Sequence, residues 1–423
     1  MKPFTFQQPE YSTKEIPKSA LRAFGIDDSG LSIVNELAEL RKQPPNFVIA
    51  ESLKNANFSQ NNFKQQTLKK KQSGFKPKYV MNIGVYKQLW FDPYNNWKVL
   101  RPASMKFKNI YRPYTGQDLT DKTLLVTRTG GIGDLLFIQP NLIYLKEKYP
   151  SCKIKFACGP QYHAMVEAWD CVDELLNLPF TIKHLISSDY HAFFEGVIER
   201  CEQARHINAY NLFSKWLGLD LPDEKLIPKQ KPKEEMVEKC KIFLNDNNVD
   251  TPFIIIQLRA SSSIRTPRPE VWKELIEVLV DKGHKIIITD GPNVKHQIDN
   301  FISELDEKCK NKVLNFAHVS ETLDYSIALT SLAKLAIATD SSLMHIAASL
   351  GTPAFGIYFP FPGEIRLTTY KNVDWIGPTN VHCAPCFLHG SQPCKNSKDG
   401  HSLCYDTLDI NKSIEKIEGL LND

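Results

Sequence analysis

The stretch Lys122–Gly159, KTLLVTRTGGIGDLLFIQPNLIYLKEKYPSCKIKFACG, decides the fold of this chain. It opens with an apolar run that predicts a buried strand. A loop with three glycines follows, ahead of an amphipathic helix. The run KIKFACG at the end predicts a second strand. A strand, a helix and a strand in this order make a βαβ unit, which builds parallel sheets with helices on their faces. The stretch therefore predicts an α/β fold.

The same alternation continues along the rest of the chain. A third apolar run, Val172–Leu178, completes the first group. The Pro- and Lys-rich linker Leu226–Glu235 is the predicted domain boundary, and the alternation restarts at the strand FIIIQL, Phe253–Leu258. Further strands are expected at KIIITD, VLNF, LAIATD and TPAFGIYF, and helices at Tyr162–Trp169, Pro269–Asp281, Val294–Leu305, Leu323–Ser331 and Ser342–Leu350. Strands this apolar lie inside doubly wound sheets, so we expect two tandem α/β domains with a ligand cleft between them.

The front of the chain lies outside this pattern and is basic. Residues 1–120 contain 19 Lys/Arg and 9 Asp/Glu, a charge of +10, so the remainder of a chain with net charge +4 carries −6. Within this front, Gly30–Lys42 predicts a short helix and Tyr79–Tyr111 a small β-rich module. Between them, Lys54–Lys78 holds seven lysines and no acid. It is either a solvated linker or, because phenylalanines interleave with the lysines, a surface for an anionic partner.

Composition narrows the class of protein. With 42% hydrophobic and 24% charged residues, the chain is neither collagen-like nor wholly disordered. No stretch approaches the roughly 18 apolar residues of a membrane span, and the start, MKPFTFQQPEY, lacks the apolar core of a signal peptide. Six of the ten cysteines are scattered, as is typical of reduced thiols. We therefore expect a soluble, cytoplasmic protein.

The glycine loop carries the first set of candidate functional residues. Gly130, Gly131 and Gly133 follow a strand and precede a helix, so backbone N–H groups are free to face a ligand. The spacing does not fit the dinucleotide pattern G-x-G-x-x-G. Asp134 opens the helix instead. It either complements the helix dipole or, at a cleft, acts as a general base.

Two further clusters follow strands in the second half. The stretch Arg259–Arg268 offers hydroxyls, backbone N–H groups and guanidinium groups, which suit a phosphate site, the alternative being a solvated basic turn. In the second cluster, Asp340 and Ser341 either cap the following helix or hold sugar hydroxyls. His345, in the same cluster, is a packed histidine or a ligand.

Four cysteines crowd into the segment 383–404. Cys383, Cys386, Cys394 and Cys404 supply four thiolates within 22 residues, a spacing that suits tetrahedral Zn or Fe. The alternative is four reduced thiols or one disulfide. Four thiolates leave no open coordination position, so we predict a structural metal rather than a catalytic one.

Several of these motifs together resemble glycosyltransferase family 9, the heptosyltransferase-like enzymes. The similar stretches are RTGGIGDLLFIQPNLIYLKEKYPSCKI with CVDELLNLP, ATDSSLMHIAASLGTP with IYFPFPGEIR, and the ending HCAPCFLHGSQPC with LCYDTLDINKSIEKI. They span about Lys122–Leu421. The resemblance implies a GT-B fold, in which two Rossmann-like doubly wound domains face a cleft. The implied division is an accessory module at 1–118, an acceptor domain at 119–232 and a nucleotide-sugar domain at 233–423. Some members carry an iron-binding cysteine finger, which the ending also resembles.

The resemblance further implies inverting transfer of a heptose-like sugar from a nucleotide diphosphate-sugar, typically ADP-heptose, to an acceptor hydroxyl, without a catalytic metal. Asp134 takes the place of the general base. The donor-binding positions are Gly130, Gly131, Gly133, Ser261, Arg265, Asp340, Ser341 and His345. Arg265 stands where the family usually has a lysine that neutralises the diphosphate. Ser342 replaces a usual glycine, and Pro267-Arg268 a usual Trp-Pro. The segment after Gly291 lacks an acid that often meets the ribose.

The alternative function is that of a catalytically inactive nucleotide- or nucleic-acid-binding module on the same scaffold. Such a module would use the basic front of the chain to bind nucleic acid. A nicotinamide-dependent oxidoreductase fits poorly, because the glycine loop departs from its fingerprint. The acceptor class is open between a glycolipid, a protein and a nucleic acid, with the +10 front favouring an anionic one. We expect no membrane span, and a homo-oligomer is left open.

Overall fold

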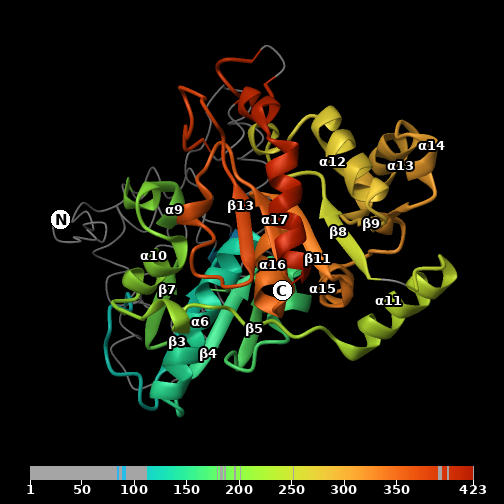
Figure 1. Cartoon of the computed structure of the whole chain (residues 1–423). Helices are drawn as coiled ribbons and strands as arrows, with labels where there is room; N and C mark the ends of the chain where they lie inside the picture. Colours follow the sequence, from blue (N-terminus) through green and yellow to red (C-terminus); the bar gives the residue numbers. More distant parts are fainter. Residues whose placement is uncertain are drawn as a thin grey trace, which may run out of the picture.

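The computed structural model describes residues 83–84, 88–91 and 112–422, apart from 179, 182–183, 185–186, 195–196, 201, 251, 389–392 and 398–399. Two parallel sheets, each with helices packed on it, form the body (Figure 1). The predicted α/β class is therefore confirmed. The expected helix at Gly30–Lys42 and the basic stretch Lys54–Lys78 lie outside the described residues.

The first sheet has four parallel strands in the order β5-β4-β3-β7. Its strands are β3 (Thr123–Thr127), β4 (Lys153–Cys158), β5 (Glu174–Asn177) and β7 (Tyr190–Phe193). Its helices are α6 (Ile132–Lys148), α7 (His163–Val166), α9 (Val197–Arg200) and α10 (Ala209–Trp216). The central strand β3 is apolar and buried, and it ends where the glycine loop begins.

The second sheet has six parallel strands in the order β10-β9-β8-β11-β12-β13. They are β8 (Phe253–Gln257), β9 (Lys285–Ile288), β10 (Val313–Asn315), β11 (Leu335–Thr339), β12 (Ala354–Ile357) and β13 (Val373–Ile376). The helices are α11 (Glu234–Asp246), α12 (Pro269–Asp281), α13 (Lys295–Ser303), α14 (Glu307–Lys310), α15 (Leu323–Leu332), α16 (Ser342–Leu350) and α17 (Ile410–Asn422). The strands β8 and β11 are buried almost throughout, as their uniformly apolar sequences predict.

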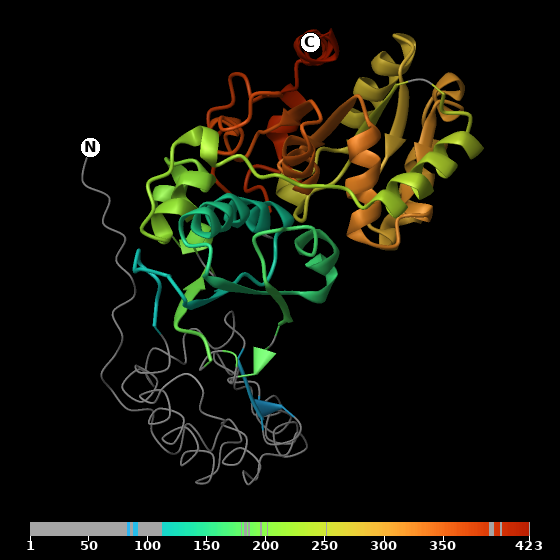
Figure 2. The same ribbon diagram turned by 90° about the horizontal axis from the view of Figure 1, so that it is seen from below.

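The two halves meet through α6 and α16. Every residue of α6 from Leu135 to Leu142 is buried, because the first sheet lies on one side of the helix and the second half of the chain on the other (Figure 2). Residues of α16, among them Leu343 and Met344, belong to the same hydrophobic cluster as Leu136 and Phe137. This apolar contact holds the start of α6 close to the start of α16.

The predicted linker crosses from the first half to the second as an extended segment that is hydrogen-bonded to both. Gln139 of α6 exchanges two hydrogen bonds with the backbone of Lys229, at 2.6 and 2.7 Å. The backbone N–H of Gln230 donates to the carbonyl of Ser349 at 3.0 Å. The side-chain oxygen of Gln230 accepts from the indole N–H of Trp169 at 2.9 Å. These bonds fix the path between the two sheets.

Part of the front of the chain is described as strand. The short strands β1 (Ile83–Gly84) and β2 (Gln88–Phe91) pair antiparallel, and β2 also pairs with β6 (Phe180–Thr181). Both lie in the stretch for which the sequence predicts a β-rich module. Among the described helices, none is long and apolar enough to cross a membrane.

Candidate functional site

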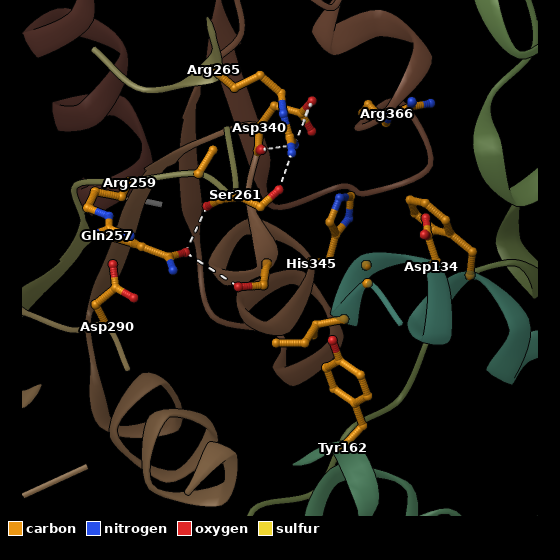
Figure 3. Close-up of a pocket in the computed structure, with 17 residues that line it drawn as sticks. Asp134, Tyr162, Gln257, Arg259, Ser261, Arg265, Asp290, Asp340, His345 and Arg366 are labelled. Atoms are coloured by element: carbon orange, nitrogen blue, oxygen red, sulfur yellow. Dashed lines mark hydrogen bonds and ion pairs between the residues drawn. The ribbon is translucent and has the colours of Figure 1, made fainter. Parts of the chain in front are cut away.

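A cavity of about 400 Å³ opens where the glycine loop of the first half faces the strand ends of the second. That volume lies within the range of small-molecule sites. Its lining residues come from both halves: Gly131, Ile132, Gly133, Asp134, Phe137 and Tyr162 from the first, and Gln257, Arg259, Ala260, Ser261, Arg265, Asp290, Asp340, Ser341, Ser342, His345 and Arg366 from the second (Figure 3). All but one of the site residues predicted outside the cysteine segment lie in this wall, and the exception, Gly130, is adjacent.

Asp134 lies in the first turn of α6 and forms an ion pair with Arg128, the residue that follows β3. The side chain of Asp134 is 21% exposed, whereas that of Arg128 is 5% exposed. Arg128 is held in place by the carbonyls of Gly130 at 3.1 Å and Phe194 at 3.0 Å. The carboxylate is therefore fixed by a buried guanidinium and turned toward the cavity.

The glycines of the loop leave room mainly for side chains of the protein itself. Gly131 has φ of 83°, and a Cβ there would lie 2.5 Å from a carboxylate oxygen of Asp134. A Cβ on Gly133 would lie 2.8 Å from the ring of His345, so this glycine lets α6 approach α16. At Gly130 the nearest atom is the hydroxyl of Tyr162, at 3.1 Å from such a Cβ.

Arg265 and Asp340 form a second, more deeply buried pair on the other wall of the cavity. Nη1 of Arg265 donates to the backbone carbonyl of Asp340 at 2.6 Å and lies 3.3 Å from its carboxylate. The other nitrogens donate to the hydroxyls of Ser261 at 2.5 Å and Ser262 at 3.1 Å. The two side chains are only 7% and 5% exposed. Arg265 thus fastens the loop after β8 to the end of β11.

Gln257, at the end of β8, is a cavity residue that the sequence reasoning missed. Its side-chain oxygen accepts hydrogen bonds from the hydroxyl of Ser341 at 2.8 Å and from the backbone N–H of Leu343 at 3.3 Å. It therefore satisfies the first turn of α16, which the side chain of Ser341 does not cap. A polar residue ending an otherwise apolar strand was the available signal.

His345 lies in the cavity wall, between Asp134 and Asp340 (Figure 3). It is buried, with its Nδ1 at 3.0 Å from the hydroxyl of Tyr370, which in turn contacts the hydroxyl of Tyr210 in the first half. The ring of Phe137 lies edge-on at 4.9 Å. Both interpretations of His345, a packed histidine and a ligand-binding one, are therefore compatible with the structure, since it is packed and also lines the cavity.

A neighbouring cavity of about 410 Å³ shares Ile132, Tyr162, Gln257, Asp290 and Ser342 with the first. Its wall adds Ser320, Glu321 and Thr322, together with apolar residues such as Leu323 and Ile346. Burial raises the pKa of the Asp290 carboxyl, although a hydrogen bond from the N–H of Gly291 at 2.7 Å and the nearby Arg259 oppose the shift. The second cavity thus provides two acids close to the segment after Gly291, which itself contains none.

In the described part of the chain, no three of the four cysteines predicted to bind a metal are grouped as ligands, although Cys383 and Cys386 are near enough to act on Cys404 electrostatically. Cys404 is buried beside the hydroxyl of Ser402 at 2.6 Å, and burial raises the pKa of its thiol to about 11. Cys383 is exposed and accepts from the side chain of Asn396 at 3.2 Å, whereas Cys386 lies 3.9 Å from the carbonyl of Pro360. No group of three His, Cys, Asp or Glu side chains in the described ranges is placed to hold a metal ion. As arranged, the thiols of this segment, Cys394 included, do not fit a tetrahedral metal site.

His401 of this segment and the two residues directly after the segment support the cavity wall from behind. The hydroxyl of Tyr405 donates to the backbone carbonyl of Arg265 at 2.9 Å. Arg268 and Asp406 form an ion pair at 2.5 Å, and a ring nitrogen of His401 lies 3.3 Å from the carbonyl of Thr266. The end of the chain therefore packs on the loop that carries Arg265.

Known proteins resemble this chain in sequence and in fold. Residues 201–395 match the model of Glycosyltransferase family 9 (heptosyltransferase). No curated protein matches the chain in sequence. The structure of Escherichia coli ADP-heptose LPS heptosyltransferase II superposes with a TM-score of 0.57 at 14% identity, covering 71% of this chain and 98% of that one. A family 9 glycosyltransferase from Veillonella parvula gives 0.57 at 16% identity, over 72% and 99%.

A third similar structure is TibC, an iron-containing dodecameric glycosyltransferase from enterotoxigenic E. coli. Its TM-score is 0.51 at 14% identity, and the match covers 72% of this chain and 78% of that one. Identities this low relate the proteins by fold. The shared fold confirms the predicted GT-B arrangement of two parallel-sheet halves about a cleft.

Proposed function

We propose that the chain is a glycosyltransferase of the family 9 type, which transfers a heptose-like sugar, with inversion, from a nucleotide diphosphate-sugar to an acceptor hydroxyl. The observation that carries this proposal is the single cavity lined by Asp134 from one half and by Ser261, Asp340 and Ser341 from the other. A base on one wall and sugar- and phosphate-binding groups on the other are what a direct displacement requires.

In the proposed reaction Asp134 takes the proton of the acceptor hydroxyl. The oxygen then forms a bond to the anomeric carbon as the bond from that carbon to the diphosphate breaks, and the configuration inverts. The ion pair with Arg128 supports this role, because it orients the carboxylate toward the cavity. The glycine at position 131 supports it too, since a side chain there would collide with the carboxylate.

The donor is proposed to lie along both cavities. Its diphosphate would meet the hydroxyls of Ser261 and Ser341 near the start of α16, where the helix dipole favours anions. Its ribose would meet Asp290 or Glu321 in the second cavity, which is also apolar enough to hold a base. Heptosyltransferase II is described as an ADP-heptose enzyme, which supports ADP-heptose as the donor to try first.

Arg265, Asp340 and His345 are proposed to act through position rather than as mobile ligands. Arg265 is engaged by Asp340 and two serines, so it supports the shape of the phosphate loop and adds positive charge behind it. Asp340 faces the donor sugar from the end of β11. His345 separates the sugar from the acceptor side, next to Gly133.

The test is the release of ADP from ADP-heptose by the full chain, with acceptors of the three classes supplied in turn. Asp134→Asn is expected to lower kcat by about 10²- to 10⁴-fold, the usual contribution of a positioned general base. Asp173→Asn is the matched control, because Asp173 pairs with Lys146 in the last turn of the same helix, at 2.8 Å. Full turnover in Asp134→Asn would exclude the proposed base.

For the acceptor, the charge of +10 on residues 1–120 supports an anionic molecule. A homo-oligomer is also proposed, because the similar structure TibC is described as dodecameric, and light scattering tests it. Salt-sensitive DNA binding by a protein that binds no ADP would favour the inactive-module alternative.

A further inference from the structure

Arg366 is a buried cation in the wall of the main cavity for which the proposed mechanism has no use. It follows the short turn Gly363–Ile365 after β12 and is 2% exposed. Its guanidinium lies over the ring of Phe361, 4.0 Å from the centroid. Both terminal nitrogens are buried, and neither makes a hydrogen bond to any described residue.

The charges around the cavity leave Arg366 without an acid of its own. Asp134 pairs with Arg128, and Asp340 pairs with Arg265. The third carboxylate in the wall, Asp290, lies near Arg259. Arg366 has no carboxylate within ion-pair distance among the described residues, although Asp340 and Asp134 are near enough to act on it electrostatically.

An arginine stays protonated in a protein, so a charge of +1 is buried here without a partner in the part of the chain that the structure describes. Burying an uncompensated charge is costly, and its two free nitrogens form a fork that matches a pair of anionic oxygens. The cation over Phe361 offsets only part of this cost. The position is also informative, because Arg366 is placed between Asp134 of the first half and Asp340 of the second (Figure 3).

We propose that Arg366 binds an anionic group of a substrate, a phosphate or a carboxylate, at the point where the acceptor and the donor meet. This inference rests on the proposed function, because the same cavity would hold both substrates. Two sources share the required chemistry. One is the diphosphate that leaves the donor, and the other is an acidic group carried by the acceptor.

The experiment uses Arg366→Met, which keeps the length of the side chain and its contact with Phe361, and Arg366→Lys, which keeps the charge without the fork. Arg205→Met is the matched control, because Arg205 also lies over an aromatic ring, that of Phe387, but is exposed and outside the cavity. ADP and inorganic pyrophosphate are titrated into each protein by calorimetry. Inorganic phosphate is then titrated into each protein saturated with ADP.

If the anion is the diphosphate, Arg366→Met weakens ADP and pyrophosphate by about 10- to 100-fold, as expected for charge-assisted hydrogen bonds, and Arg366→Lys recovers part of the loss. If the anion belongs to the acceptor, ADP affinity is unchanged, but the ADP-saturated wild type binds phosphate and Arg366→Met does not. Equal binding of all three ions by Arg366→Met and the wild type overturns the proposal.

Thermal stability separates this role from a structural one. Removing an unpartnered buried charge is expected to leave the melting temperature of Arg366→Met unchanged or raised, whereas a structural arginine would lower it. A lowered melting temperature together with unchanged anion binding would also overturn the proposal. If the wild type binds pyrophosphate but turns over no sugar donor, the proposed transfer fails while the anion site stands.

Discussion

The glycine loop of the first half and the loop after β8 in the second half each set an arginine against an aspartate beside the start of a helix, yet the two pairs differ in exposure. Asp134 is 21% exposed and its arginine 5%, whereas Asp340 and Arg265 are 5% and 7% exposed. Arg128 is held by backbone carbonyls, and Arg265 by two hydroxyls and a carbonyl.

From this difference in exposure we infer that the two Asp-Arg pairs have different roles. A carboxylate that is fixed on one side and open to the cavity on the other can exchange a proton with a substrate. A pair in which both side chains are buried joins two strand ends and keeps the cavity in shape. The same residue types at the same kind of position are therefore separated by burial, which only the folded chain reveals.

Asp340→Ala is expected to have the largest effect on stability of the substitutions that test this comparison of the two pairs. Removing one partner of a buried ion pair leaves an uncompensated charge, and we expect a loss of about 3–5 kcal/mol in stability. Asp134→Asn should cost less, because Asp134 faces the cavity and Arg128 keeps its two carbonyl partners. Denaturant unfolding of both variants checks the order. An equal loss in the two would mean that both pairs are structural.

The contacts between the halves give the next prediction. Tyr370→Phe removes the hydroxyl that joins His345 to Tyr210 and leaves two buried polar groups without it. We expect a loss of about 1–3 kcal/mol. Because this linkage lies behind the cavity wall, ADP binding should persist, and calorimetry beside thermal unfolding tests both statements. Tyr325→Phe, at a half-buried tyrosine of α15 outside the cavity wall, is the control.

Much of the fold could be predicted from the sequence, because local signals coincided with it. The helices Pro269–Asp281 and Ser342–Leu350 have the predicted bounds, since Pro opens the first and Gly351, with φ of 79°, ends the second. The strands β7 and β13 were missed because each is four residues long and includes polar residues. The predicted helix Tyr162–Trp169 is shorter, with an α-helical part of only His163–Val166.

The site was harder to predict where it depends on contacts between distant segments. Asp134 and Asp340 are marked by following strands, and Gln257 by being the polar end of an apolar strand, but nothing local marks Arg366. Arg366 is the last residue of the stretch IYFPFPGEIR, and its role could not be predicted from the sequence. Its burial and its lack of a partner among the described residues are properties of the packed structure. The metal site expected from the cysteine spacing stays a prediction, because spacing alone does not bring side chains together and no three ligand side chains of the described residues are grouped for an ion.

The half-buried carboxyl of Asp290 gives a pH-dependent prediction. Its pKa is raised by burial above the ordinary 3.8, so ionisation costs more in the folded state than in the unfolded state. The wild type therefore loses stability as the pH rises from about 3.8 through the folded pKa, and Asp290→Asn does not. Thermal unfolding should show a more stable variant at pH 7 and little difference at pH 3. A difference that does not change with pH would contradict the assignment.

The smallest expected effect concerns the cysteine segment, where sequence and structure disagree. The thiol of Cys383 is exposed and accepts one hydrogen bond, so the structure predicts that Cys383→Ser changes stability by no more than about 0.5 kcal/mol. A structural metal would give a large loss instead, matched by a chelator and by about one equivalent of iron or zinc in elemental analysis. Tyr405→Phe completes the comparison, because it removes the hydrogen bond to the carbonyl of Arg265 without touching a thiol. If Tyr405→Phe destabilises the protein and Cys383→Ser does not, the segment stabilises the buried pair by packing; the reverse result would establish a metal centre there.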